Sequence, residues 1–183
     1  TITPSADIGA GPHLPNGARR GESITITLGA LQTFQALAPS KSVQRYEDLT
    51  GTRILSDKPI AVYGGHVCTT LSNTWGACNH LVEQMPPVDY LGKHFLTAPM
   101  QVSKLRGYQG DFLRVLAAYP NTEVRVDGKL VATLQRGATY NTLTGYADGA
   151  HEIAGAFKQS DRVRHRGSQA TSLSPRRGAR GFR

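Results

Sequence analysis

The chemically richest part of the chain is residues 64–87, GGHVCTTLSNTWGACNHLVEQMPP, which holds both cysteines. Cys68 and Cys78 enclose a short loop, and His66 and His80 each lie two positions outside a cysteine. Because residues i and i+2 of a strand share a face, His66 can point the same way as Cys68. Two His and two Cys can form a tetrahedral zinc site, although structural zinc sites usually space each ligand pair about two to five residues around a turn.

A disulfide between Cys68 and Cys78 is the other interpretation of this segment, and it is the one that we favour. By the chain-entropy estimate, closing a loop of this length contributes roughly 2–3 kcal/mol of stability. Two cysteines with no third also fit an oxidising compartment. The loop would contain Trp75, and the histidines would be ordinary hydrogen-bonding residues. The zinc site and a pair of free thiols remain alternatives.

The sequence gives little support for catalysis. It contains no GxSxG, HExxH or GxxxxGK[ST] motif. Cys68 and His66 could form a nucleophile pair, and Asp57, Asp111 and Glu83 could supply the two carboxylates of a glycoside hydrolase. Spacing alone does not distinguish these acids from ordinary surface residues. We therefore predict no enzymatic activity and no cofactor, and a metal-dependent, jelly-roll-like hydrolase using the His/Cys cluster is the alternative.

The net charge of +8 is concentrated at one end of the chain. Residues 158–183 hold eight of the 21 basic residues and one of the 13 acidic residues, so the rest is nearly neutral. This Arg-, Gly- and Ser-rich composition predicts a disordered tail. Binding of a polyanion, RNA or heparin, through this tail is a further alternative function. No apolar run reaches the ~18–20 residues of a membrane helix.

Short strands and tight turns are the elements expected to position these residues. Polar and apolar residues alternate along Glu22–Leu28, and Asp127-Gly128 separates two alternating runs, which is typical of a type I′ hairpin turn. No window has a sustained helical pattern. The sequence therefore predicts an all-β fold of antiparallel, β-sandwich-like modules. Further strands are predicted at residues 34–38, 52–55, 59–67, 112–118, 123–126, 129–134, 138–143 and 152–156.

A weak internal repeat suggests how the chain is divided. Residues Thr25–Leu37 align with Ala132–Leu143 at a constant offset, which indicates either a tandem pair of modules or a chance similarity of short strand patterns. We predict a first β module at residues 1–104 that lacks its early strands. An incomplete second module follows at residues 105–157, and the basic tail occupies residues 158–183.

Three segments resemble the N-terminal domain family of IgG Fc-binding protein: Asp48–Cys68, Cys78–Phe95 and Gly110–Gly128. The most specific parts are SDKPIAV with the following GH.C, and C.HL.EQ.PP. The resemblance extends from about Glu22 to Ala156. It implies a secreted, non-enzymatic, β-rich module that binds immunoglobulin Fc, and it implies that Cys68 and Cys78 are bridged.

Ligand binding is then expected in the loops that the β scaffold carries. Trp75 is the only tryptophan, and tryptophan is enriched at the energetic centres of interfaces. Folding of Trp75 back over the disulfide is the alternative role for this side chain. The expected partner is extracellular, either a protein such as immunoglobulin Fc or a mucin glycan. The candidate ligand-binding residues are Asn73, Trp75, Glu83, Gln84 and Tyr90.

Overall fold

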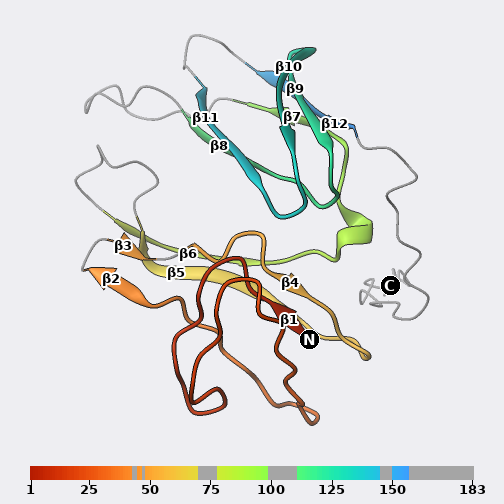
Figure 1. Ribbon diagram of the computed structural model, residues 1–183. Coiled ribbons are helices and arrows are strands. Elements are labelled where there is room, and N and C mark those ends of the chain that lie inside the picture. Colours follow the sequence, from red (N-terminus) through yellow and green to blue (C-terminus); the bar gives the residue numbers. More distant parts are fainter. Residues whose placement is uncertain (43–44, 47, 70–77, 99–110, 145–149, 157–183) are drawn as a thin grey trace, which may run out of the picture.

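The fold is described from a computed structural model that covers residues 1–42, 45–46, 48–69, 78–98, 111–144 and 150–156 (Figure 1). Every strand pairing in these residues is antiparallel. The prediction of an all-β, antiparallel fold is therefore confirmed. The elements are β1 (Ile2–Thr3), β2 (Ser40–Ser42), β3 (Arg45–Tyr46), β4 (Arg53–Ile54), β5 (Tyr63–Thr69), β6 (Asn79–Gln84), the 3-10 turn η1 (Val88–Tyr90), β7 (His94–Thr97), β8 (Asp111–Leu116), β9 (Thr122–Val126), β10 (Lys129–Leu134), β11 (Thr139–Thr144) and β12 (His151–Ala156).

The largest sheet has the strand order β10-β9-β12-β7. The other pairs are β1-β4, β2-β3, β5-β6 and β8-β11. Figure 1 shows two groups of elements: β7 to β12 lie together in one half, and β1 to β6 lie in the other. Strand β7 precedes residue 105, yet it pairs with β12 along residues 94–97. The division into modules at residues 104 and 105 stays a prediction, and the predicted tail lies outside the described residues.

The hairpin of β9 and β10 turns at Asp127 and Gly128, as the sequence predicts. Their φ angles are 49° and 77°, the positive values that a type I′ turn requires. The Asp127 carboxylate reaches β12, where its Oδ2 lies 2.7 Å from Nδ1 of His151 and its Oδ1 accepts the amide of Glu152 at 2.9 Å. The contact with His151, followed by the Glu152 amide, lowers the pKa of Asp127 below its ordinary value. The turn is thereby fixed to the neighbouring strand.

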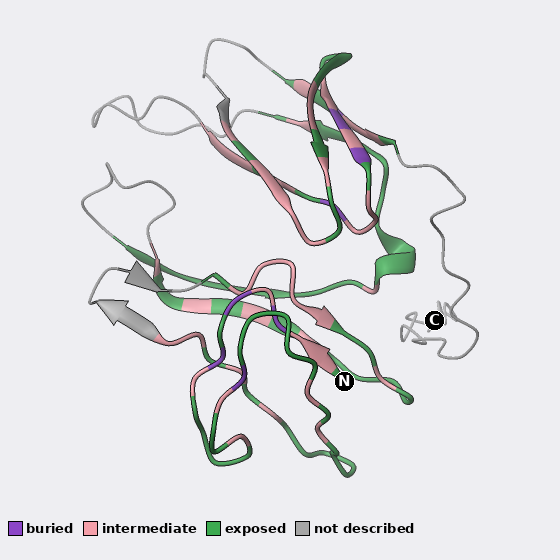
Figure 2. Cartoon of the chain, in the orientation of Figure 1, coloured by how far each residue is buried: buried purple, intermediate pink, exposed green. Residues whose placement is uncertain are grey.

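The core is small and lies mainly in two places, and Ala117 after β8 is buried as well (Figure 2). In the large sheet, Val124 of β9 and Ile153 of β12 are buried on one face. Near the N-terminus, Ala6, Ile8 and Ala18 are buried where Ile8 and Ala18 form an isolated bridge. Many large apolar side chains remain exposed elsewhere, so the strands outside these two places offer their apolar faces to solvent.

The strands predicted at 22–28 and 34–38 are wrong. Ile24 makes one isolated bridge with Ile2, and residues 34–38 form no strand. Alternation of side chains defines two faces, but a strand also needs a neighbour to accept its backbone hydrogen bonds. The aligned segment Ala132–Leu143, in contrast, contributes to the paired strands β10 and β11. The strand predicted from Pro59 begins only at Tyr63.

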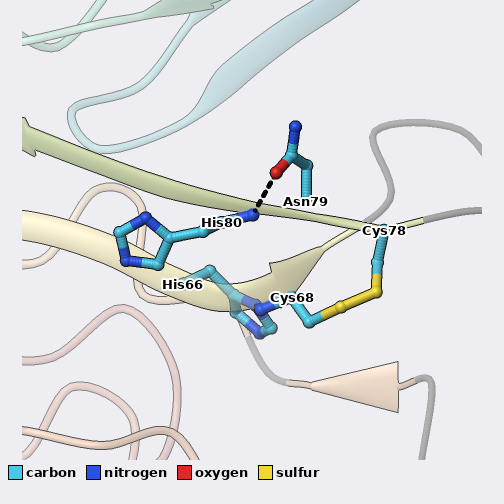
Figure 3. The surroundings of a disulfide bond; sticks show 5 residues. All are labelled: His66, Cys68, Cys78, Asn79 and His80. Atoms are coloured by element: carbon cyan, nitrogen blue, oxygen red, sulfur yellow. Dashed lines mark hydrogen bonds between the residues drawn. A yellow bond between two sulfur atoms is a disulfide. The ribbon is translucent and has the colours of Figure 1, made fainter.

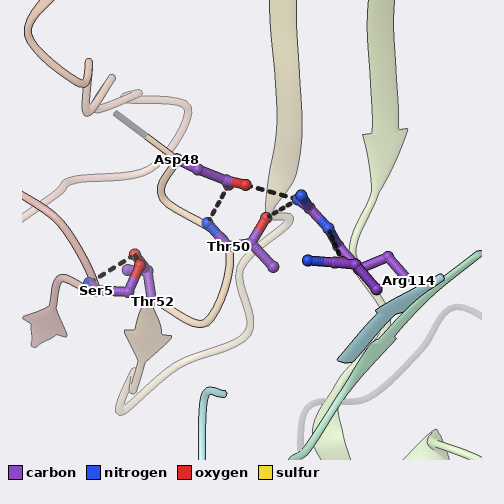
Figure 4. A network of polar contacts seen from close by, with 6 residues as sticks. Ser5, Asp48, Thr50, Thr52 and Arg114 are labelled. Carbon is purple, nitrogen blue, oxygen red and sulfur yellow. Dashed lines mark hydrogen bonds and ion pairs between the residues drawn. The ribbon is translucent and has the colours of Figure 1, made fainter. Parts of the chain in front are cut away.

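A turn at residues 48–51 connects the two halves (Figure 4). Asp48 Oδ1 accepts the amide of Thr50 at 2.9 Å, and Arg114 of β8 donates from Nη1 to Asp48 Oδ2 at 2.6 Å. Arg114 also donates from Nε to Asn141 of β11 at 2.9 Å. One guanidinium therefore bridges the turn and the β8-β11 pair. Gly51 lies directly against the backbone of Gly137, so close that a Cβ on Gly51 would overlap the Gly137 carbonyl oxygen.

This network predicts an acid-sensitive contribution to stability. Partial burial alone would raise the pKa of Asp48, but hydrogen bonds from Thr50 and the contact with Arg114 outweigh it and lower the pKa. A carboxyl group with a lowered folded-state pKa stabilises the fold above its unfolded pKa of about 3.9, and loses that effect as pH falls through the folded value. Both side chains are more than one-third exposed to solvent, so we expect less than about 1 kcal/mol.

The measurement is urea unfolding of the parent chain and of Asp48→Asn between pH 7 and pH 3. The parent should lose more stability than the variant over the acidic part of this range, because the variant has no carboxylate at position 48 to protonate. Asp127 is unchanged in both proteins, so its own titration cancels in the comparison. Equal acid dependence of the two proteins would show that the ionised Asp48 carboxylate, with its contacts to Thr50 and Arg114, contributes nothing to stability.

Candidate functional site

The β5-β6 hairpin positions the conspicuous His/Cys segment. Its register pairs Tyr63 with Gln84, Gly65 with Val82 and His66 with Leu81. The strands approach closely at Gly65, where a Cβ would lie 2.7 Å from the carbonyl oxygen of Leu81. A side chain at position 65 would push β6 away, so glycine is required for this register.

One face of the hairpin is open to solvent. Directly paired residues share a face of a sheet, so Tyr63, Gly65, Val82 and Gln84 lie together, and Val67 follows two positions after Gly65. The exposed fractions are 65% for Tyr63, 60% for Val82 and 85% for Val67. We call Tyr63, Val67, Val82 and Gln84 the Tyr63 face. It combines an aromatic ring and two β-branched side chains on a surface that no described residue covers.

The disulfide predicted as the favoured interpretation is present: Cys68 and Cys78 are joined, with their Cα atoms 5.0 Å apart (Figure 3). Cys68 lies within a register shift between His66 and Thr69, and the alternation of exposed and half-buried residues along β5 continues through Val67 and breaks at Cys68. The Cys68 amide donates to Nδ1 of His66 at 3.0 Å. The disulfide therefore joins β5 and β6 at the loop end of the hairpin. Beside it, Nδ1 of His66 accepts a hydrogen bond from the Cys68 amide.

Both sulfur atoms are consumed by this bond, so neither can act as a thiolate ligand. Within the described residues, no group of three or more His, Cys, Asp or Glu could hold a metal ion. His80 is exposed, and its own amide donates to Oδ1 of Asn79 at 2.9 Å. The four-residue zinc set is not assembled in this arrangement.

The three carboxylates considered for glycoside hydrolysis belong to different parts of the chain. Asp57 follows β4, Glu83 lies on β6 and Asp111 begins β8. The strands that carry Glu83 and Asp111 belong to different strand pairs, β5-β6 and β8-β11.

The candidate ligand-binding residues are divided between two surfaces. Gln84 belongs to the Tyr63 face, whereas Glu83 lies on the opposite face of β6, as the alternation of a strand dictates. Tyr90 lies in η1, where its ring is exposed and its amide donates to the carbonyl oxygen of Pro87. Asn73 and Trp75 lie outside the described residues.

Sequence reasoning missed Tyr63, Val67 and Val82. The predicted strand at residues 59–67 contains Tyr63 and Val67, but no strand was predicted at Val82, and nothing in the pattern says whether an apolar face is covered. The one useful signal is the Gly64-Gly65 pair, which removes side chains from the middle of β5 and leaves the flanking Tyr63 and Val67 prominent.

The fold and the site define an all-β module with antiparallel sheets and one disulfide-closed, exposed hairpin. No helix in the described residues is long and apolar enough to cross a membrane. No solved structure matches the chain.

The family described as IgGFc binding protein matches residues 1–155. The human (Homo sapiens) IgGFc-binding protein is 31% identical over 90 residues, an alignment that covers 42% of this chain and 2% of the human protein. This chain therefore belongs to the IgGFc-binding protein family, and at the family level it is a binding module. The predicted family resemblance is confirmed.

Proposed function

We propose that the chain is an extracellular, non-enzymatic adhesion module that binds a protein ligand through the Tyr63 face. The observation that carries the proposal is the exposure of Tyr63, Val67 and Val82 on one face of a hairpin. Grouped apolar and aromatic side chains at the surface are typical of binding sites rather than of ordinary solvated strands.

The disulfide favours binding by limiting the conformations of the hairpin. It joins Cys68 and Cys78 at the end where β5 and β6 would otherwise separate. A surface that is already ordered loses less entropy when the ligand binds, so more of the contact energy appears as affinity. The same bond supports an extracellular location, because disulfides persist in oxidising compartments.

Immunoglobulin Fc is the first ligand to test, since the human relative is named for IgG Fc binding and this chain shares its family. A mucin glycan is the second. Gln84, a member of the Tyr63 face, would add polar contacts, and Asn73, Trp75, Glu83 and Tyr90 are retained as further candidates.

The test is binding of immobilised IgG Fc by the parent chain and by Tyr63→Ala and Val82→Thr. Removing a buried interface aromatic commonly costs about 2 kcal/mol, so we expect Tyr63→Ala to weaken binding at least tenfold. Val82→Thr keeps a β-branched residue on the strand and should weaken binding less.

Leu96→Ala on β7 is the matched control, because Leu96 is also strongly exposed but lies in the large sheet. Its affinity for Fc should equal that of the parent. Full affinity of folded Tyr63→Ala would exclude the Tyr63 face, and binding of mucin glycans alone would replace Fc as the ligand. Trp75→Ala, compared with the parent in the same assay, decides whether the bridged loop takes part.

A further inference from the structure

A β-bulge sets the directions of the side chains at the loop end of the β5-β6 hairpin. The first pairs of the hairpin follow one register, which ends with His66 opposite Leu81. Before the next pair, β5 has two residues, Val67 and Cys68, whereas β6 has only His80. Val67 and Cys68 are both exposed, although successive residues of a regular strand point to opposite faces. The bulge therefore turns both of them to the same open face.

His80 belongs to this same face. Because residues i and i+2 of a strand share a face, His80 lies on the face of Val82 and Gln84. It also lies opposite Val67, which is a member of the Tyr63 face. The disulfide lies at the same end of the hairpin (Figure 3). The Tyr63 face therefore extends to the bridged end of the hairpin and includes an imidazole next to Val82.

The part of the chain that forms this face carries almost no charge. Residues 59–82 contain no Asp, Glu, Lys or Arg, and with both cysteines bonded their ionisable side chains are Tyr63, His66 and His80. His66 lies opposite Leu81, on the other face of the hairpin, and a tyrosine ring is neutral at physiological pH. His80 is thus the one member of the face whose residue type changes charge between about pH 5 and 8.

The surroundings of His80 hold no group that would pair with a positive charge on its ring. Glu83 is three positions away along β6, so it lies on the opposite face. Strand β5, which packs against β6, places the uncharged Val67 and Cys68 opposite His80. No other described residue forms a hydrogen bond or ion pair with the imidazole. Water solvates the exposed ring, and a ligand that covers the face removes this water.

We propose that His80 makes binding by the Tyr63 face specific for an uncharged protein surface and dependent on a neutral imidazole. This inference rests on the proposed function and names the chemistry of its ligand. Because the face has no charge, a complementary surface also has none, and the contacts are apolar or are neutral hydrogen bonds. A proton taken up from acidic solvent places an unpaired cation in the contact, which is costly to bury, and the ligand dissociates.

The first test measures the Kd of the parent chain and of His80→Gln for immobilised IgG Fc at pH 7.4 and pH 5.5, at one ionic strength. Glutamine keeps a polar side chain but does not titrate. Relative to His80→Gln, the parent should bind about fivefold more weakly at pH 5.5 than at pH 7.4. Titratable groups of Fc act on both proteins, so they cancel in the ratio of the two Kd values. His94→Gln, at an exposed histidine of β7, should keep the pH dependence of the parent.

The second test places a permanent charge on each face of β6. His80→Lys should weaken binding of Fc at least tenfold at pH 7.4, because the ammonium group would be buried without a partner. Asn79→Lys is the matched control, since Asn79 is the exposed neighbour of His80 on the opposite face. It should bind Fc like the parent. Equal weakening by the two lysines would contradict the placement of His80 in the contact.

The outcomes separate this inference from the proposed function. Fc binding by the parent at pH 7.4, with the same parent to His80→Gln ratio of Kd values at both pH values, would overturn the inference alone. A parent that gains affinity in acid relative to His80→Gln would indicate a carboxylate of the ligand beside His80 and would also overturn it. Failure of the folded parent to bind Fc at pH 7.4 would overturn the proposed function and this inference with it.

Discussion

Gly51→Ala should destabilise the protein by about 3 kcal/mol. Part of this cost, about 1–2 kcal/mol, arises because Gly51 has a φ angle of 91°, which alanine adopts only with strain. The rest arises because the new Cβ would overlap the carbonyl oxygen of Gly137 and force the two halves apart. Urea unfolding monitored by circular dichroism measures the difference in the free energy of unfolding.

Gly21→Ala is the matched control for the part of the stability loss that comes from backbone strain. Gly21 has a φ angle of 79°, but a Cβ there would meet no atom within 4 Å. It should cost only the 1–2 kcal/mol of backbone strain. Should Gly51→Ala cost no more than Gly21→Ala, the close approach of Gly51 and Gly137 would have no energetic importance.

Loss of the disulfide is the second large effect that we expect. The double variant Cys68→Ser/Cys78→Ser should be about 2–3 kcal/mol less stable than the parent, because it reopens the loop between two residues ten positions apart. The parent treated with a reductant should lose a similar amount, and thermal unfolding with and without reductant measures both effects.

The double variant also controls for other effects of the reductant on stability, since it has no disulfide to reduce. Its melting temperature should be the same in both conditions. Two titratable thiols in the native, untreated parent would contradict the bridge. An unchanged melting temperature after complete reduction would show that the bond does not stabilise the fold.

The strands of the C-terminal half were predicted better than those of the N-terminal half, because a hairpin turn between neighbouring residues can be recognised in the sequence. The Asp127-Gly128 turn requires positive φ at two adjacent residues, so its sequence determines the hairpin and the pairing of β9 with β10 next to the turn. No such turn fixes residues 22–28, where the partner strand would have to come from a distant part of the chain. Sequence alternation alone therefore predicted a strand that the structure does not pair.

The site was predicted only in part for a similar reason. The bridge between Cys68 and Cys78 was favoured from the number of cysteines and the family resemblance, because two cysteines allow a single intramolecular pairing. The grouping of Tyr63 with Val82 depends on the cross-strand register, which the sequence of one strand does not contain. The separation of Glu83 from Gln84 follows from the alternation along β6, a strand that was not predicted.

Strand β7 affects where the polypeptide can be cut without breaking the four-stranded sheet. It supplies an outer neighbour for β12 in the four-stranded sheet, although it precedes the predicted boundary at residue 105. A shortened polypeptide starting at residue 105 would expose the backbone groups of His151–Ala154, a ready template for intermolecular pairing. A C-terminal piece that keeps this pairing therefore includes His94–Thr97.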